Sequence, residues 1–243
     1  MTDKNSSSDR SRQSALFMDV LSHDVLNNNQ AVLSYLELIL ASPEMSPRSR
    51  NYAEKAVSHI RASTVLVEDA NRLIAARALD VGALKPFDLL KAVDYAKKEL
   101  GGYFPARRIR VHMEPGPKDM FVLGDTLVQY LVLNAFLDMV KVDSADNVDV
   151  TVRGRKSELN GKICWSLTLS DANAKLLPSM KSDLPELYTQ DSSKTVKLAG
   201  FLFVKTIAEL LGGKFEAREL VGGAKKKETG VEFVLTLAKG GTP

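Results

Sequence analysis

The 243-residue chain contains a single cysteine, and no stretch of it stays apolar for long. One thiol cannot form a disulfide within the chain, so a disulfide framework is excluded and a reducing compartment is expected. A membrane-spanning helix needs about 20 apolar residues, and the first twelve residues are polar, without the apolar core of a secretory signal. We therefore predict a cytoplasmic protein with no segment in a membrane.

An excess of charge of one sign is also lacking. The 33 Lys and Arg residues are nearly balanced by 30 Asp and Glu residues, which leaves a net charge of +3. This balance does not favour a nucleic acid or an anionic membrane surface as a partner. The run of lysines at 225–227 is short, and we interpret it as the solvated tip of a hairpin.

Glycine and proline are absent from residues 14–40, where apolar side chains recur at spacings of three and four. This pattern predicts one long amphipathic helix. Two prolines end it within 41–47, and a second helix is predicted over about 48–79, so the two helices form an antiparallel hairpin. The predicted contact stripe of the first helix is Phe17, Leu21, Val25, Asn28, Val32, Leu36 and Ile39, and that of the second is Ala53, Ala56, Ile60, Ser63, Val67, Ala70 and Ile74.

Further apolar residues of the hairpin lie outside these stripes. A hairpin of two helices cannot bury them, whereas two copies can. We therefore predict a homodimeric four-helix bundle; docking of the hairpin onto the rest of the chain is the alternative. The residues concerned are Leu16, Val20, Leu33, Leu38, Leu66 and Leu73.

Residues 80–86 are predicted to be a linker, with a domain boundary near residue 82. The predicted organisation is a disordered N-terminus (1–12), a helical hairpin (13–81) and an α+β domain (82–243). In the last, helices alternate with an apparently antiparallel sheet, as in a two-layer sandwich. The predicted helices are 88–100, 125–142 and 197–211, and the strands are 108–113, 120–123, 147–155, 162–170, 214–220 and 230–238.

His23 is one of three histidines, and the helical pattern turns it away from the predicted stripe, about 200° round the helix from Leu21 and Val25. Asp24 is its neighbour, and Asn27 follows one turn later on the same face. A neutral imidazole can attack through one nitrogen while a carboxylate holds or removes the proton of the other. Asp24 would then be the base, and Asn27 would bind a phosphoryl oxygen or a water. By residue type alone, such a pair is more often an ordinary helix surface.

The segment 21–30, Leu-Ser-His-Asp-Val-Leu-Asn-Asn-Asn-Gln, followed by Tyr-Leu-Glu-Leu at 35–38, resembles the H-box of sensor histidine kinases, especially the archaeal type. The resemblance implies that His23 is the phosphoacceptor, that Asp24 assists it and that Asn27 controls phosphatase activity. The hairpin resembles the dimerisation and phosphotransfer domain of the same family.

Residues 82–243 resemble the ATP-binding domain of these kinases, a Bergerat-type sandwich. In the helix similar to the N-box, Asn134 matches the first asparagine, Asp138 stands at the magnesium-binding position and Lys141 at the lysine position. A carboxylate is a competent Mg²⁺ ligand. Asp171 matches the aspartate that reads the adenine amino group.

The glycines of this nucleotide site are largely missing. Asn173 and Lys175 replace those of the first glycine box, and only Gly200 remains of the second, at 199–203. Glycines let the backbone approach phosphates in conformations that cost other residues energy. Asn134, Asp138, Asp171 and Gly200 are therefore expected to bind a cofactor only if ATP binds at all.

An intact phosphoacceptor region with an eroded nucleotide site resembles the dimeric histidine phosphotransferases. We expect a protein that relays phosphoryl groups between response-regulator receiver domains through His23. It would bind no cofactor or metal of its own, since receivers bring Mg²⁺. One alternative is an active kinase with a divergent ATP site, which would use Asp138 and Asp171; another is a pseudokinase scaffold that binds a response regulator.

Overall fold

The computed structural model describes residues 3–76, 79–176, 180, 192–221 and 229–241. The chain forms two compact units, Met1–Ala78 and Leu79–Pro243, which divide close to the boundary predicted near residue 82. Among the described helices, none is long and apolar enough to cross a membrane. The lysine run 225–227 lies outside the described residues.

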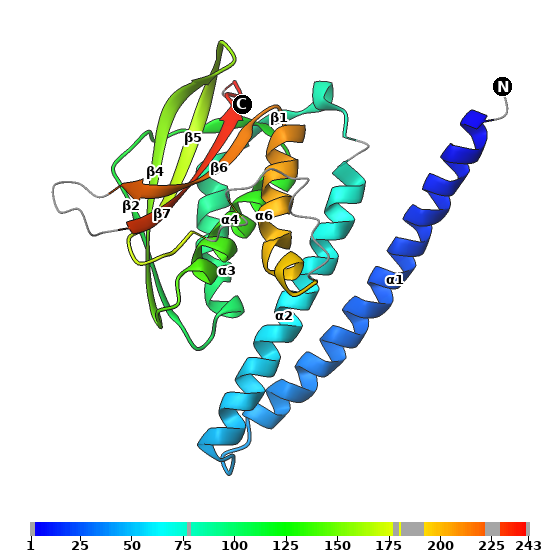
Figure 1. The fold of residues 1–243 in the computed structure, drawn as a ribbon, viewed down its shortest axis with the longest axis vertical. Helices are drawn as coiled ribbons and strands as arrows, with labels where there is room; N and C mark the ends of the chain where they lie inside the picture. Colours follow the sequence, from blue (N-terminus) through cyan, green and yellow to red (C-terminus); the bar gives the residue numbers. More distant parts are fainter. Residues whose placement is uncertain (1–2, 77–78, 177–179, 181–191, 222–228, 242–243) are drawn as a thin grey trace. The chain divides into compact units, whose positions relative to one another are not determined.

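The first unit is a hairpin of two long antiparallel helices, α1 (Asp3–Leu40) and α2 (Pro47–Ala76) (Figure 1). Helix α1 begins at Asp3, so residues 3–12, which we predicted to be disordered, continue the helix; no glycine or proline interrupts them. Ser46 begins α2, because its Oγ accepts a hydrogen bond from Ser49 N at 3.1 Å and Pro47 occupies the first helical position.

The buried stripe of α1 differs from the predicted one. Of the predicted positions, Val25 and Leu36 are half-buried, but Leu21, Asn28, Val32 and Ile39 are exposed, so the prediction was wrong for these four. One residue turns the helix by about 100°, and the observed stripe includes polar positions that a pattern of apolar residues overlooks. Its members are Ser22, Val25, Leu26, Asn29, Leu33, Leu36 and Leu40.

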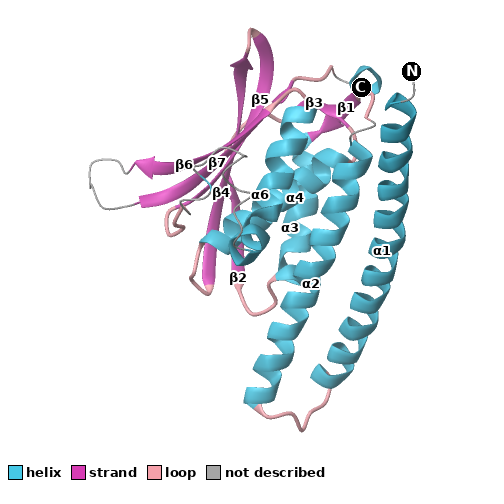
Figure 2. Cartoon of the chain, turned by 45° about the vertical axis from the view of Figure 1, so that its right-hand side comes forward, coloured by secondary structure: helices cyan, strands magenta, loops and turns pink. Residues whose placement is uncertain are grey.

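The second unit is a two-layer α+β sandwich, which confirms the predicted fold class. Figure 2 shows helices α3, α4 and α6 on one face of a sheet, whose five strands follow the order β2-β4-β5-β7-β6. The strands are β2 (Arg108–Met113), β4 (Asn147–Leu159), β5 (Lys162–Asp171), β6 (Lys214–Val221) and β7 (Thr229–Ala238), and the helices are α3 (Leu89–Tyr103), α4 (Leu127–Val142) and α6 (Ser192–Leu210).

Two features of this unit differ from the prediction. Strands β2 and β4 are parallel, so the antiparallel prediction holds only for the other pairs of this sheet. The predicted linker includes a 3-10 turn (Val81–Ala83) and the start of β1 (Lys85–Asp88), which pairs with β3 (Phe121–Gly124) as a separate two-stranded sheet. Pro86 is compatible with such an edge strand because its missing N–H is not needed for pairing there.

The core of the second unit lies between the helices and the sheet. Helix α4 is the central helix, since all of its residues from Leu131 to Val140 are buried. Two of them, Asn134 and Asp138, are polar and need internal partners. Cys164 is a free, buried thiol, as predicted. The hydrophobic face of the sheet includes Val148, Val150, Val152, Leu167, Leu169, Phe233 and Leu235.

Candidate functional site

The orientation of His23 follows from polar contacts between α1 and α2. Ser22 Oγ donates a hydrogen bond to Asn71 Oδ1 at 2.8 Å. Two turns further on, Asn29 Nδ2 donates to Ser63 Oγ and to Thr64 Oγ1, both at 3.2 Å. These contacts fix the rotation of α1 about its axis. The next residue after Ser22 must then point outward, and the His23 side chain is 74% exposed, which confirms the predicted exposure.

The structure brings the three predicted residues of this site together. Asn27 Nδ2 lies 3.2 Å from His23 Nδ1 and 3.4 Å from Nε2, and Asp24 Oδ1 lies 3.6 Å from Nδ1. When the ring proton is on Nδ1, the Asp24 carboxylate is its charged neighbour and Nε2 carries the lone pair. The amide N–H of Asn27, whose Nδ2 lies 3.4 Å from Nε2, must turn away from this lone pair before it can attack an electrophile. The amide of Asn27 stands over the ring edge, where it can donate to an incoming oxygen.

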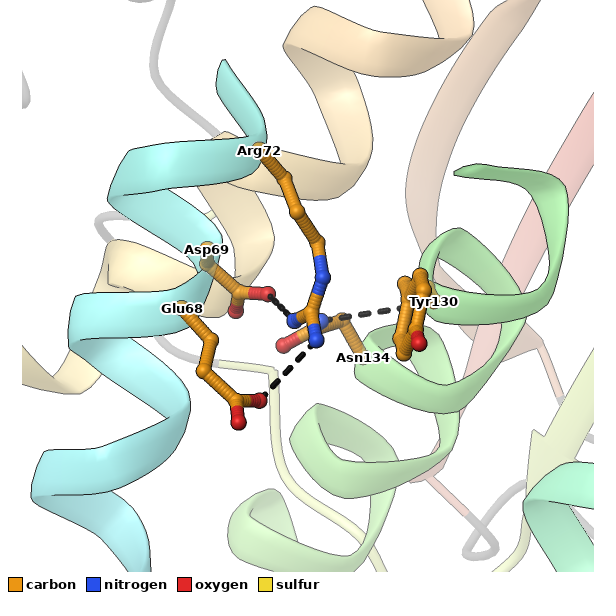
Figure 3. A network of polar contacts seen from close by, with 5 residues as sticks. All are labelled: Glu68, Asp69, Arg72, Tyr130 and Asn134. Carbon is orange, nitrogen blue, oxygen red and sulfur yellow. Dashed lines mark hydrogen bonds and ion pairs between the residues drawn. The ribbon is translucent and has the colours of Figure 1, made fainter. Parts of the chain in front are cut away.

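A charged cluster on α2 consists of Glu68, Asp69 and Arg72 (Figure 3). Arg72 donates from Nη2 to Glu68 Oε2 at 2.9 Å and from Nη1 to Asp69 Oδ1 at 3.0 Å. Burial acts to lower the pKa of Arg72, but the two carboxylates outweigh it and the pKa is raised. Sequence reasoning missed this cluster and Ser22; the available signals were charges at three- and four-residue spacing and a serine beside the histidine.

Two of the residues matched to the N-box, Asn134 and Asp138, are buried in α4. Asn134 is 1% exposed, and its Nδ2 donates back to the carbonyl oxygen of Tyr130 at 3.1 Å, within the same helix (Figure 3). Asp138 is also 1% exposed, and Lys141 Nζ donates to its Oδ1 at 3.0 Å. Burial raises the pKa of Asp138, and Lys141 only partly opposes this.

Gly200 backs directly onto Asp138. A Cβ at Gly200 would lie 2.6 Å from Asp138 Oδ1 and 2.8 Å from Oδ2, closer than van der Waals contact permits. The absence of a side chain at Gly200 therefore gives the carboxylate its place between α4 and α6. In the structure this glycine makes room for a side chain of the protein itself.

Asp171 is also held inside. Its Oδ1 accepts a hydrogen bond from Asn173 N at 2.8 Å. Burial raises the pKa of Asp171, and the nearby Asp143 carboxyl, which sequence reasoning missed, raises it further. Among the described residues, no N–H or O–H group donates to the Oδ2 atom of either aspartate. One proton held between the two carboxyls would satisfy both oxygens.

The replaced glycines do not use the conformations open only to glycine. Asn160 is the one non-glycine residue with positive φ in the described part of the chain, so Asn173 and Lys175 have ordinary backbones. Lys175 N donates to the carbonyl oxygen of Val142 at 3.1 Å, which ties this segment to the end of α4. The segment is therefore held by the domain's own backbone.

These residues do not fit Mg²⁺ and ATP well. The candidate ligands are almost fully buried, Asp138 is paired with Lys141, and Asp171 is engaged with Asn173 and Asp143. A divalent cation needs several oxygen ligands that face it. In the part of the chain that the structure describes, no group of three or more His, Cys, Asp or Glu side chains could hold a metal ion.

Comparison with known proteins identifies the fold. No protein-family model and no curated protein matches the chain. Among solved structures, it is similar to the mycobacterial sensor histidine kinase MprB, with a TM-score of 0.50 and 16% identity over 66% of this chain and 100% of that chain. It is also similar to full-length ShkA in complex with AMPPNP, with a TM-score of 0.59 and 17% identity over 93% of this chain.

The chain has the fold of a sensor histidine kinase catalytic core, a helical hairpin followed by a sandwich of the ATP-binding type. This confirms, for the fold, the resemblance inferred from the sequence; the roles that the H-box resemblance implies for His23, Asp24 and Asn27 stay predictions. The chain spans 46% of the length of ShkA. At these identities the likeness concerns the fold, and the chemistry must be argued from the residues.

Proposed function

We propose that this protein is a histidine phosphotransfer protein of a two-component system, which relays phosphoryl groups between response-regulator receiver domains through His23. One observation carries the proposal: an exposed imidazole stands on a helical hairpin with Asp24 and Asn27 within 3.6 Å of its Nδ1. A nucleophile directed at a partner needs this accessibility.

The proposed reaction is transfer from an aspartyl phosphate of the receiver to His23. The Nε2 lone pair attacks phosphorus, the P–N bond forms, and the bond between phosphorus and the carboxylate oxygen breaks. The electron pair of that bond stays on the receiver's aspartate. The imidazole becomes a cation that keeps its Nδ1 proton, and Asp24 stabilises this charge. Transfer to a second receiver is the reverse process. Mg²⁺ is supplied by the receiver.

The nucleotide region supports transfer rather than autophosphorylation. Asp171, at the adenine-reading position, is engaged with Asn173 N and with the Asp143 carboxyl. The Asp138 carboxylate occupies the space next to Gly200 where a side chain would lie, and the following residue, Phe201, is buried. A nucleotide would have to displace these internal contacts, each of which contributes to stability.

We expect the hairpin to pair with a second copy. Helix α1 exposes a group of large apolar residues, and a monomer seldom leaves such a group in water. Pairing across a two-fold axis would cover the same surface on both copies and form a four-helix bundle. The exposed fractions are 55% for Val20, 44% for Leu21, 42% for Val32, 67% for Tyr35, 71% for Leu38 and 51% for Ile39.

Phosphotransfer from radiolabelled receivers tests the proposal. The purified chain is mixed with a panel of receiver domains carrying labelled aspartyl phosphate, and label on the chain is followed in time. We expect acid-labile label on the wild type and none on His23→Gln. His59→Gln is the matched control, since His59 is an exposed histidine of α2. Label that persists in His23→Gln would refute the role of His23.

An active histidine kinase is the second candidate, because the fold likeness covers 93% of this chain in a structure that was solved in complex with AMPPNP. Incubation with radiolabelled ATP in the absence of any receiver separates the two. Label on His23 under these conditions would favour the kinase. No label, combined with transfer from a receiver, supports the relay, and binding of receivers without any transfer would favour a scaffold.

A further inference from the structure

A cavity of about 680 Å³ lies in the second unit, where the chain beyond β7 passes between β3 and β5. Its volume is in the range of sites for small organic ligands. Among the residues that line it are three lysines, one aspartate and two aromatic side chains: Lys118, Lys156, Lys239, Asp119, Phe121 and Trp165.

The wall of this cavity is fixed by backbone contacts. Gly240 N donates to the carbonyl oxygen of Phe121 at 2.8 Å, and Lys239 N donates to that of Ile163 at 3.1 Å. A Cβ at Gly240 would lie 2.9 Å from the carbonyl oxygen of Val122, so the chain passes here with no room for a side chain. The cavity therefore has a preformed wall, which lowers the entropic cost of binding.

The charges around the cavity are unbalanced. No carboxylate in the described part of the chain lies in ion-pair distance of Lys118, Lys156 or Lys239. Asp119 is the one acidic residue among those that line the cavity. Three ammonium groups around one hollow repel each other, and an anion between them removes that repulsion.

One wall of the cavity is flat and apolar. Trp165 is 4% exposed and stands opposite Lys156 in the β4–β5 register. The Lys156 ammonium lies 5.8 Å from the centre of the indole ring, a cation–π distance. Phe121 adds a half-buried ring. A planar group would therefore meet the half-buried ring of Phe121 and the small exposed part of Trp165, next to positive charge.

The cavity is separate from the nucleotide region. Trp165 and Asp171 lie on the same strand, β5, and a separation of six positions along the chain corresponds to roughly 20 Å of strand. No residue of the cavity wall belongs to the group Asn134, Asp138, Asp171 and Gly200. The binding site is thus independent of whether the protein binds ATP or transfers phosphate.

We propose that this cavity binds a small organic anion, a phosphate or carboxylate group attached to a planar apolar body. The anionic group lies among Lys118, Lys156 and Lys239, and the planar body packs against Phe121 and the small exposed part of Trp165. The observations that carry the proposal are the preformed wall, the three lysines with no carboxylate of the described residues in ion-pair distance, and the aromatic side chains at the same hollow.

Trp165 provides the readout, because it is the only tryptophan of the chain. The full chain is titrated with phenyl phosphate, benzoate and inorganic phosphate while tryptophan emission is recorded, and calorimetry measures the same affinities. We expect saturable quenching by phenyl phosphate, weaker binding of benzoate, which carries less charge, and still weaker binding of inorganic phosphate, which lacks the planar body. Benzyl alcohol, which is neutral, should not bind.

Variants test the assignment of the lysines. Lys118→Ala/Lys156→Ala/Lys239→Ala should weaken phenyl phosphate binding by about tenfold or more, since charge-assisted hydrogen bonds are lost. The matched control is Lys55→Ala/Lys91→Ala/Lys98→Ala, which removes three exposed lysines elsewhere and should bind like the wild type. Lys156→Met alone preserves the shape and should weaken binding less.

Four results would overturn the proposal. The first is that neither phenyl phosphate nor benzoate shows saturable binding, and the second is that benzyl alcohol binds as tightly as phenyl phosphate. The third is that the two triple variants bind phenyl phosphate with equal affinity. The fourth is that a Glu-rich peptide binds while none of the small anions does. Melting curves of both triple variants are recorded to check that they are folded. Because phosphotransfer is measured separately, a failure here leaves the role of His23 untouched.

Discussion

Ser22 Oγ donates a hydrogen bond to Asn71 Oδ1 at 2.8 Å, and Ser22 is the residue immediately before His23. Ser22 is 3% exposed, whereas the His23 side chain is 74% exposed. A helix turns by about 100° per residue, so a contact that holds Ser22 inward also holds His23 outward. The orientation of the candidate phosphoacceptor thus depends on a polar contact between the two helices.

Replacement of Ser22 tests this relationship. Ser22→Ala removes the hydroxyl that donates to Asn71 Oδ1, so this oxygen loses its hydrogen bond. The free energy of unfolding should fall by about 1 kcal/mol. The measurement is urea unfolding followed by circular dichroism. Ser34→Ala is the control, since Ser34 Oγ bonds only a backbone carbonyl at an exposed position; its loss should change stability by less than about 0.5 kcal/mol. Equal losses in the two variants would contradict the proposed role of Ser22.

Asp24 is expected to support the chemistry of His23 rather than the fold. Asp24→Asn keeps the shape but removes the charge that stabilises the imidazolium, and the transfer rate should fall by roughly 10- to 100-fold. The stability should stay within about 0.5 kcal/mol, because the side chain is 70% exposed. Glu44→Gln, an exposed change in the turn, is the control for transfer. An unchanged transfer rate in Asp24→Asn would exclude Asp24 from the reaction.

Self-association through α1 is the next prediction. Leu38 is 71% exposed and Tyr35 is 67% exposed, and a charge placed in a paired interface would be buried without a partner. Leu38→Glu should shift the protein from dimer toward monomer, as measured by light scattering after size-exclusion chromatography. Asn51→Glu, at an exposed polar position of α2, should not. A wild type that is monomeric at high concentration would rule out the dimer.

Gly200 and Gly101 form a matched pair for a test of packing. Gly200→Ala places a Cβ 2.6 Å from Asp138 Oδ1 and should destabilise the domain by about 1–3 kcal/mol. Gly101→Ala meets nothing within 4 Å in helix α3 and should stabilise it by about 0.5–1 kcal/mol. Thermal melting measures both. If Asp138 is the obstacle, Asp138→Ala and Gly200→Ala combined should cost less than the sum of the single changes.

The carboxyl pair predicts a dependence of stability on pH. Burial and Asp143 raise the pKa of Asp171 above its value in the unfolded chain. The folded state then holds this proton more tightly, so the contribution of this group to stability is largest below about pH 4 and falls as pH rises to the raised pKa. In Asp171→Asn the side chain at position 171 does not titrate, so stability is not lost in this way as pH rises. The new amide N–H can donate a hydrogen bond to the Asp143 carboxylate.

We therefore expect Asp171→Asn to be similar in stability to the wild type near pH 4, and more stable by about 1 kcal/mol at pH 8. Urea unfolding across this range measures the difference, with the exposed Asp146→Asn as the control. A variant that is less stable than the wild type at pH 8 would show that Asp171 is ionised there and stabilised by its surroundings.

Most of the secondary structure could be predicted from local patterns. Residues 108–113 form β2 as predicted, and α4 begins within two residues of its predicted start, because alternation and helical periodicity are properties of short segments. Strand β1 was missed because it has only four residues, one of them a proline, and is stabilised by β3. The parallel pairing of β2 and β4 joins segments far apart in the chain, and no local pattern encodes it.

The sequence by itself determined the hairpin and the sandwich, since helical periodicity and strand alternation are local. Only the tertiary structure decided which face of α1 is buried and so which way His23 points, that Asp143 meets Asp171, that Gly200 accommodates Asp138 and that three lysines and Trp165 line one cavity. The physical reason is that a polar side chain can be placed inside wherever a partner on another element satisfies it. Such a partner is chosen by folding and not by neighbours in the chain.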